Sequence, residues 1–304
     1  MHALIHDPDA PRGIRLGEAP EPVPGSSQAL VEVRAVALNF GELAYISDFR
    51  KPGEVPGSDA AGVVVKAAAD GSGPAVGSRV ATVGWSDGWA ELRAVDTGEL
   101  AVVPEGLDLG AAATLPVAGV TALRALRRLG PVVGRRVLVT GASGGVGRFA
   151  VQLAARAGAE VVAAVGSPAR GEGLRELGAS EVVVGLDGVT APVFGVLENV
   201  GGPLLAQAYS LVEVGGSVQS IGKASLEPST IDFEAERLRG GGRGIEVFTI
   251  GSGLGPDIAY LVGELAAGRL DPQIGWRGSW ERAAEAAEAL FGRTIRGKAV
   301  LDLD

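Results

Sequence analysis

The spacing of apolar residues changes near residue 117 and divides the chain into two kinds of pattern. From Met1 to about Val117, short apolar runs alternate with Gly and Pro, which predicts an all-β module. Four of these runs are 29–38, 60–68, 78–85 and 90–95. Within 119–130, in contrast, the apolar residues fall on one side of a helix that ends at Gly130.

The region that follows alternates buried strands with helices. Residues 135–140 predict a buried strand, a helical apolar spacing runs from Val146 until Gly158, and a second buried strand is predicted at 160–165. The alternation continues through 173–179, 181–185, 193–200, 203–213, 215–222 and 244–250. It predicts a parallel, doubly wound sheet, which a helix near 256–268 closes.

The last stretch, 273–304, reads as strand, helix and strand and is too short to be a domain alone. We therefore expect it to return to the N-terminal module. The predicted fold is α/β, with a β-rich domain of residues 1–117 and 270–304 and a doubly wound parallel-sheet domain of residues 118–269.

Composition narrows the classes of partner. The 304 residues carry a net charge of −9, which disfavours nucleic acid, because phosphate binding depends on clustered Lys and Arg. The absence of cysteine excludes disulfides and thiolate metal sites. No window approaches the roughly 18 apolar residues of a membrane span, and the N-terminus lacks a basic segment followed by an apolar one. We expect a cytoplasmic protein with no membrane partner.

The stretch "GASGGVGR" at 141–148 carries the clearest chemistry. It follows a buried strand, opens a helix and lies in a strand–helix–strand unit, which is the context of a dinucleotide-binding loop. Gly144 and Gly147 permit the tight turn and the close packing of the helix. Ser143 and the amides near Gly145 and Val146 then face a pyrophosphate at the positive end of the helix.

A second superfamily opens in the same way. Thr140 together with this stretch also fits the start of short-chain dehydrogenases, which pair it with a catalytic Tyr-x-x-x-Lys. The residues four positions after the tyrosines of this chain are Phe49, Glu213 and Glu264, so that pair is missing.

The end of the second strand of this unit favours NADPH as the cofactor. An acidic residue there would bind the ribose of NAD, whereas this chain has Gly166, Ser167 and Arg170, with no carboxylate until Glu172. Arg pairs with a phosphate through two donors. The alternative is that Arg170 is an ordinary exposed helix residue.

Several motifs in order give the chain a resemblance from end to end. It resembles the zinc-free medium-chain dehydrogenase/reductases of the quinone oxidoreductase, or zeta-crystallin-like, group. The resemblance implies a GroES-like catalytic domain, a Rossmann domain, and NADPH-dependent reduction of quinones or α,β-unsaturated carbonyl compounds. The matching motifs include "ALNFGE" at 37–42, "PGSDAAGVV" at 56–64, "TLPVAGVTA" at 114–122, "ENVGG" at 198–202 and "RGKAVL" at 296–301.

The same resemblance argues against a metal. Zinc-dependent members place Cys where Asn39 stands and Gly-His-Glu where Gly57-Ser58-Asp59 stands. Zinc prefers thiolate, imidazole and carboxylate, so Asn39 and Ser58 are not credible ligands and Asp59 alone cannot hold the ion. We therefore expect no metal.

The remaining candidate residues are implied by the resemblance. Asn39 would lie near the nicotinamide ribose or carboxamide and Thr121 near the nicotinamide face. Asn199, Val200 and Gly222 would lie along the cofactor crevice. Thr121 could instead cap or bend its helix, and Asn199 could make a turn.

The proton donor is open. Glu42 stands where the family usually has Asp, and Ala44 stands where many relatives carry a tyrosine. Tyr45 is one position away, so Tyr45, Lys223 and a solvent water all remain candidates. The candidate catalytic residues are Asn39, Tyr45 and Thr121.

Two other functions compete with quinone or enone reduction. The motifs also resemble the enoylreductase modules of polyketide synthases, so an enoyl-thioester reductase or a biosynthetic tailoring reductase is possible. Some relatives bind NADPH without catalysing a reaction. Relatives often pair the edge strand near 244–250, so we expect a homodimer.

Overall fold

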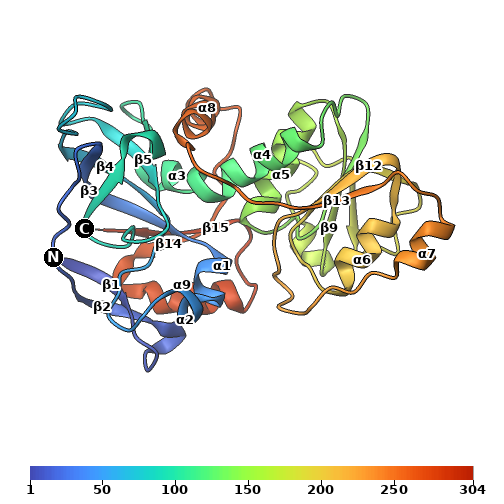
Figure 1. Ribbon diagram of the computed structural model, residues 1–304, viewed down its shortest axis with the longest axis horizontal. Coiled ribbons are helices and arrows are strands. Elements are labelled where there is room, and N and C mark those ends of the chain that lie inside the picture. The colour runs from blue at the N-terminus through green and yellow to red at the C-terminus, as the bar shows by residue number, and fades with distance from the viewer. Residues whose placement is uncertain (304) are drawn as a thin grey trace. The chain divides into compact units, whose positions relative to one another are not determined.

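The computed structural model describes residues 1–303 and contains two compact units (Figure 1). Unit 1 is Met1–Val120 together with the chain from Gly251 onward, and unit 2 is Thr121–Ile250. A β-rich unit and a parallel-sheet unit were both predicted from the sequence, and the α/β fold class is confirmed.

Unit 1 is built on a mainly antiparallel sheet in the order β14-β15-β3-β4-β5-β7, with β6 paired to β3. The C-terminal strand pairs Ala299 with Leu38, so the last segment does complete the N-terminal module, as predicted. The strands of this unit are β1 (His2–His6), β2 (Ile14–Glu18), β3 (Gln28–Leu38), β4 (Asp59–Lys66), β5 (Arg79–Val83), β6 (Leu92–Asp96), β7 (Leu100–Val102), β14 (Ile274–Ser279) and β15 (Lys298–Asp302).

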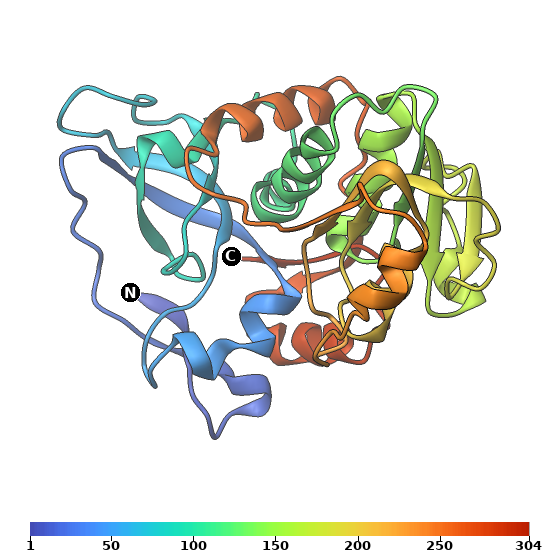
Figure 2. The same cartoon turned by 45° about the vertical axis from the view of Figure 1, so that its right-hand side comes forward.

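Short helices cover this sheet and carry part of its core. Figures 1 and 2 both show α9 beside α1, and the rings of Phe40 and Phe291 lie 5.3 Å apart. The buried alanines of α9 pack in the same core as Leu38 and Trp89. The helices of this unit are α1 (Phe40–Ala44), α2 (Ile46–Phe49), α3 (Leu109–Ala113), the π-helix η3 (Leu115–Gly119), α8 (Gly255–Ala266) and α9 (Ala283–Phe291).

One helix lies in a different unit from the one that the sequence indicated. The helix expected near 256–268 is α8, and it packs on β7 and η3 of unit 1, where Leu261 approaches Gly119. The unit boundaries therefore fall at 120/121 and 250/251 rather than at 117/118 and 269/270. Apolar periodicity shows that a helix has a face to bury, but not which sheet that face covers.

Unit 2 contains a six-stranded, fully parallel sheet in the order β10-β9-β8-β11-β12-β13. This order confirms the doubly wound sheet predicted from the alternation. Its strands are β8 (Arg136–Val139), β9 (Glu160–Val165), β10 (Glu181–Val184), β11 (Val193–Glu198), β12 (Val212–Ser220) and β13 (Gly244–Val247). Its helices are α4 (Val120–Arg128), α5 (Gly145–Arg156), α6 (Pro203–Ser210) and α7 (Phe233–Leu238).

The connection between β9 and β10 contains less helix than the alternation of apolar patterns predicted. Residues 173–179 form turns, and the 3-10 helix η4 (Pro168–Gly171) precedes them. Gly173 and Gly178 have φ of 78° and 104°, a left-handed backbone that interrupts a helix.

Candidate active site

The predicted dinucleotide-binding residues of unit 2 lie at one edge of its sheet. They follow the carboxyl ends of four parallel strands, and the strand order reverses between β8 and β11, which is where doubly wound sheets bind dinucleotides. Ser143, Gly144, Gly145, Val146 and Gly147 follow β8; Gly166, Ser167 and Arg170 follow β9; Asn199 and Val200 follow β11; Gly222 follows β12.

The glycines after β8 differ in how tightly they are packed. A Cβ at Gly147 would lie 2.3 Å from the Gly141 carbonyl oxygen, so the start of α5 approaches the loop as only glycine allows. A Cβ at Gly144, the N-cap of α5, would lie 3.4 Å from the same oxygen, an ordinary contact. The steric requirement for glycine is thus concentrated at residue 147.

Arg170 lies beside the glycine loop. Its Nε donates a hydrogen bond to Ser143 Oγ at 2.8 Å, which joins the end of β9 to the loop after β8. Arg148 in α5 also reaches this end of β9, where its Nη2 donates to the Glu172 carbonyl at 2.6 Å. The structure therefore places two guanidinium groups near the end of β9, of which sequence reasoning identified one.

Glu198, which sequence reasoning missed, organises the loop after β11. Its carboxylate accepts hydrogen bonds from Thr140 Oγ1 at 2.9 Å and from the amides of Val200 and Gly201 at 2.8 and 2.9 Å. Burial raises the pKa of Glu198. Asn199 Nδ2 donates to the Thr140 carbonyl at 2.8 Å, so the ends of β8 and β11 are tied together. The available sequence signal was an acidic residue in an apolar strand.

Gly222 completes this edge. A Cβ there would lie 2.7 Å from the Asn199 carbonyl oxygen, so the loops after β11 and β12 are in close contact. Lys223, the next residue and a candidate proton donor, is exposed.

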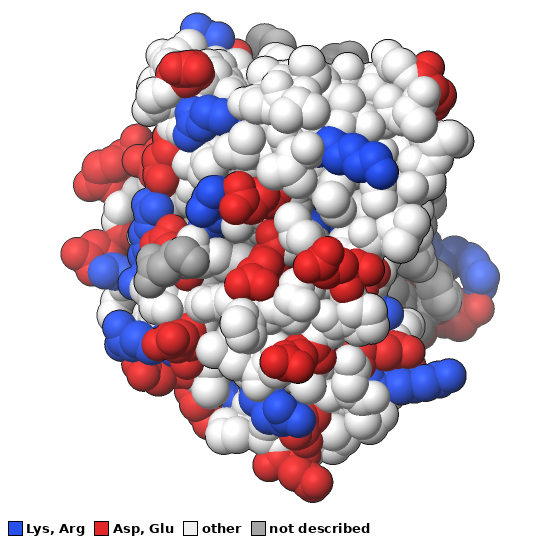
Figure 3. Space-filling model, turned by 90° about the vertical axis from the view of Figure 1, so that its left-hand side faces the viewer, with Lys and Arg blue, Asp and Glu red and all other residues white. Residues whose placement is uncertain are grey.

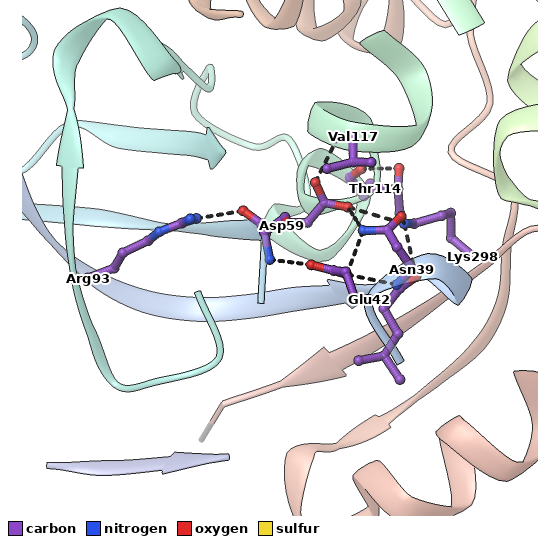
Figure 4. Close-up of polar contacts among 10 residues, drawn as sticks. Asn39, Glu42, Asp59, Arg93, Thr114, Val117 and Lys298 are labelled. Atoms are coloured by element: carbon purple, nitrogen blue, oxygen red, sulfur yellow. Dashed lines mark hydrogen bonds and ion pairs between the residues drawn. The ribbon is translucent and has the colours of Figure 1, made fainter. Parts of the chain in front are cut away.

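Unit 1 contains a group of buried and half-buried polar residues that we call the Asp59 cluster: Asn39, Glu42, Ser58, Asp59 and Lys298. Figure 4 shows how Asn39, Glu42, Asp59 and Lys298 point toward one another. Three neighbouring strands, β15, β3 and β4, bring its members together, because Asn39 follows β3 while Asp59 and Lys298 begin β4 and β15. Asp59 is fully buried and Lys298 is 3% exposed.

Asn39 is at the centre of the Asp59 cluster. Its Nδ2 donates to Glu42 Oε2 at 2.9 Å and to Asp59 Oδ2 at 2.8 Å, and its Oδ1 accepts from Lys298 Nζ at 2.5 Å. The Asn39 amide N–H also donates to Glu42 Oε2, which forms a capping box at the start of α1. The carboxamide is thus committed to partners inside the chain.

The Glu42 carboxylate shares this site with a second acid. Burial raises the pKa of Glu42, and the negative charge of Asp59 raises it further. The hydrogen bonds that Glu42 accepts from Ser58 and Asn39, and the positive charge of Lys298, have the opposite but smaller effect. The outcome is a raised pKa at Glu42.

Arg93 borders the cluster and was also missed by sequence reasoning. The residue is 1% exposed, and its guanidinium donates to Ser58 O, Thr82 Oγ1 and Ser86 O at 2.7, 3.0 and 3.1 Å. Burial lowers the pKa of Arg93 to about 10. Arg93 therefore supports the backbone around Ser58 through neutral acceptors.

The other two candidate catalytic residues are placed differently. Tyr45 is the C-cap of α1 and is half-buried, outside the Asp59 cluster. Thr121 is buried in the first turn of α4 and belongs to unit 2. Of the three candidate catalytic residues, Asn39 alone belongs to the Asp59 cluster.

A zinc ion does not fit the Asp59 cluster. The positions that face Asp59 hold a carboxamide and an ammonium group, and an ammonium group in contact with the carboxylate repels a divalent cation. Within residues 1–303, no group of three or more His, Cys, Asp or Glu side chains is placed to hold a metal ion.

The surface shown in Figure 3 carries acidic and basic side chains side by side, without a continuous basic patch on that face. Among the residues described, none of the helices combines the length and the hydropathy needed to cross a membrane.

Two ranges of the chain match models of known protein families. Residues 25–122 match the model of the alcohol dehydrogenase GroES-like domain, and residues 145–263 match that of the zinc-binding dehydrogenase domain.

Several curated relatives, including the following two, exceed 30% identity. Erythronolide synthase EryA2 of Saccharopolyspora erythraea is 33% identical over 84% of this chain and 8% of its own length. Acrylyl-CoA reductase AcuI of Ruegeria pomeroyi is 35% identical over 58% of this chain and 58% of its own length. The chain therefore matches less than two thirds of either protein.

A solved structure matches the whole chain. The Escherichia coli quinone oxidoreductase complexed with NADPH aligns with a TM-score of 0.86 over 100% of both chains, at 20% identity. At this identity the likeness shows the fold.

Proposed function

Because the chain belongs to the medium-chain dehydrogenase/reductase family, we propose that it is an NADPH-dependent, zinc-independent enzyme that transfers hydride to a quinone or an α,β-unsaturated carbonyl compound. Membership of this family supports an oxidoreductase. The cofactor, the acceptor and the independence from zinc are the proposal.

The observation that carries the proposal is the position of Arg170 at the carboxyl end of β9. The guanidinium lies against Ser143 of the glycine loop, at the place where NAD-dependent folds carry a ribose-binding carboxylate. A guanidinium favours a 2′-phosphate there through charge-assisted hydrogen bonds. The complex of the similar quinone oxidoreductase with NADPH supports the same choice.

NADPH would supply the hydride, and residues of this chain would hold and orient the cofactor. The amides of Gly145 and Val146, at the positive end of α5, would bind the pyrophosphate. Glu198 fixes the amides of Val200 and Gly201, which would keep the loop after β11 in place. Since zinc does not fit the Asp59 cluster, the acceptor must delocalise charge itself, as a conjugated carbonyl does.

A specific observation favours a second candidate, an enoyl-thioester reductase. Relatives above 30% identity support it: one is named as an acrylyl-CoA reductase, and others are named as an erythronolide synthase and a polyketide synthase. A thioester conjugated to a carbon–carbon double bond accepts hydride by the same chemistry as an enone. The two candidates therefore share a mechanism and differ in the group beyond the carbonyl.

The first experiment measures NADPH consumption with four acceptors: a 1,4-quinone, a simple enone, an enoyl-thioester and an aldehyde. We expect turnover with the quinone or the enone and not with the aldehyde. A kcat/KM at least tenfold higher for the thioester would establish the second candidate instead. Tight NADPH binding without turnover of any acceptor would support a non-catalytic NADPH-binding protein.

The second experiment tests the cofactor. In Arg170→Ala we expect the Kd for NADPH to rise about 10- to 100-fold, which corresponds to a charge-assisted contact of about 1.5–3 kcal/mol, while the Kd for NADH is unchanged. Arg175→Ala is the matched control, because Arg175 is exposed on the same connection between β9 and β10. An unchanged preference in Arg170→Ala would reject NADPH selection by this residue.

We also propose a homodimer that works in the cytoplasm. All four residues of β13, the edge strand of the parallel sheet, are exposed, and Val247 is 80% exposed. An exposed strand edge offers unpaired backbone groups to a second copy. Light scattering of wild type and Val247→Lys tests the dimer, and cell fractionation tests the location.

A further inference from the structure

We propose that Lys298 is a positioning residue whose ammonium group serves as the internal cation of the Asp59 cluster, and that it fixes the Asn39 carboxamide directly and the π-helix η3 through Asp59. The proposal rests on the proposed function only for its predicted effect on turnover. Its effect on the charge state of the cluster is independent of any substrate.

Asp59 is surrounded by charged side chains from three elements. The charged side chains that face Asp59 are Glu42 from α1, Arg93 from β6 and Lys298 from β15 (Figure 4). Arg93 donates to carbonyl and hydroxyl oxygens, whereas Lys298 Nζ lies 3.2 Å from Asp59 Oδ2. Lys298 is therefore the cation in direct contact with the buried carboxylate.

The ammonium group of Lys298 uses all of its hydrogens in hydrogen bonds within the chain. Nζ has three hydrogens, and it donates to Leu38 O at 3.0 Å, to Asn39 Oδ1 at 2.5 Å and to Asp59 Oδ2 at 3.2 Å. With every hydrogen used inside the chain, Lys298 is not placed to bind substrate or to donate a proton. Its action on chemistry runs through the groups that it holds.

The hydrogen bonds of the Asn39 carboxamide define its orientation. Both hydrogens of its Nδ2 point to carboxylates, and its Oδ1 points to the ammonium group. Turning the carboxamide over would place its oxygen against Glu42 and Asp59 and its NH2 group against Lys298, which loses all three hydrogen bonds. Lys298 thus adds a third contact that favours the orientation which the two carboxylates already favour.

Asp59 also connects the cluster to η3. The second oxygen of Asp59, Oδ1, accepts a hydrogen bond from the Val117 amide at 2.8 Å. Val117 lies in η3, which runs directly into α4 and its second residue, Thr121. π-helical turns often occur at functional sites, and here a buried carboxylate fixes one of the amides of that turn. Through its contact with Oδ2, Lys298 holds this carboxylate in place.

The test compares Lys298→Met, Asp59→Asn/Lys298→Met and the control Lys66→Met, which makes the same substitution at an exposed position of β4. The positive charge of Lys298 lowers the pKa of Glu42, so removing the cation raises the pKa of Glu42 further in the folded protein. The stability of Lys298→Met is then retained at low pH and lost as pH rises through the raised pKa. Between pH 5.5 and 8 we expect its Tm to fall by about 5 °C more than that of wild type. The double variant and Lys66→Met are expected to follow wild type.

The kinetic arm uses the acceptor identified above. We expect Lys298→Met to lower kcat at least tenfold while the Kd for NADPH, measured by fluorescence titration, stays within twofold, because the predicted dinucleotide-binding loops belong to unit 2. A loss of NADPH affinity equal to the loss of kcat, or an unchanged kcat, would overturn the positioning role.

The stability arm decides the charge role whatever the substrate. A Tm profile of Lys298→Met parallel to that of wild type overturns it. If Lys298→Met does not fold, a folded double variant supports the charge role, and a double variant that also fails to fold overturns it in favour of packing. Absence of turnover in wild type would reject the proposed function and leave the stability arm intact.

Discussion

The Asp59 cluster of unit 1 and the carboxyl edge of the sheet in unit 2 use polar groups in opposite ways. In the cluster, the carboxamide of Asn39 and the ammonium group of Lys298 are committed to partners within the chain. At the sheet edge, backbone amides and glycines dominate, and a Cβ at Gly166 would meet nothing within 4 Å. A closed network positions its members, whereas the edge with space is where we propose that a ligand binds.

The largest expected effect tests the packing of the sheet edge. In Gly147→Ala the new methyl group would clash with backbone atoms of Gly141 and Ala142. We therefore expect the loss in unfolding free energy to exceed the value of about 1–3 kcal/mol that is typical of overpacking. We expect loss of measurable NADPH binding in fluorescence titration and a lower Tm. Gly144→Ala is the matched control and is expected to fold with a near-normal Tm. Equal behaviour of the two variants would show that steric closeness does not distinguish these glycines.

The next effect tests the closed network. Asp59→Asn leaves the Lys298 ammonium group without its carboxylate and places an NH2 group against a donor, at a cost of about 3–5 kcal/mol. Urea unfolding at pH 7 measures it. Asp96→Asn, at an exposed N-cap where Asn serves as well as Asp, is expected to change stability by less than about 1 kcal/mol. A loss at Asp59 no larger than that at Asp96 would contradict a buried ion pair.

A smaller effect concerns the pKa of Glu42. Because this pKa is raised in the folded protein, the stability that Glu42 contributes is complete below its unfolded pKa and is lost as pH rises through the folded value. We expect the unfolding free energy of wild type, relative to Glu42→Gln, to fall by up to about 1.4 kcal/mol per pH unit in that interval. Urea unfolding across a pH series measures the difference. Parallel curves would show that Glu42 titrates normally.

The smallest expected effect is that of adding or removing a metal ion on activity and stability. Since the cluster contains its own cation and neither a thiolate nor an imidazole, neither chelation with EDTA nor an equimolar amount of zinc is expected to change kcat or Tm by more than the error of measurement. Activation by added zinc would contradict the placement of Lys298 at Asp59.

The sequence was most informative where a local pattern has a local cause. The strand 160–165 was predicted with the bounds that the structure has, and the helix before Gly158 ends as its glycine indicated. The alternation of strands and helices also predicted the parallel sheet of unit 2. The cofactor-binding roles of Ser143, Arg170 and the other candidate residues remain predictions that the proposed experiments test.

The sequence was least informative where partners are distant in the chain. Helix α8 has a clear apolar face, yet its assignment to unit 1 depends on β7 and η3. Glu198 and Arg93 appeared in the sequence only as charged residues within apolar strands. Their roles follow from Thr140, Ser58 and other groups brought to them by folding.

The sequence by itself determined the two kinds of unit, the glycine loop and the lack of cysteine, because periodicity, turn chemistry and composition are properties of residue types. Only the tertiary structure decided that the ammonium group of Lys298 lies against Asp59 and Asn39, 239 and 259 positions away in the chain. The pairing of β15 with β3 and of β3 with β4 brings these residues together, and burial makes their charges dependent on one another.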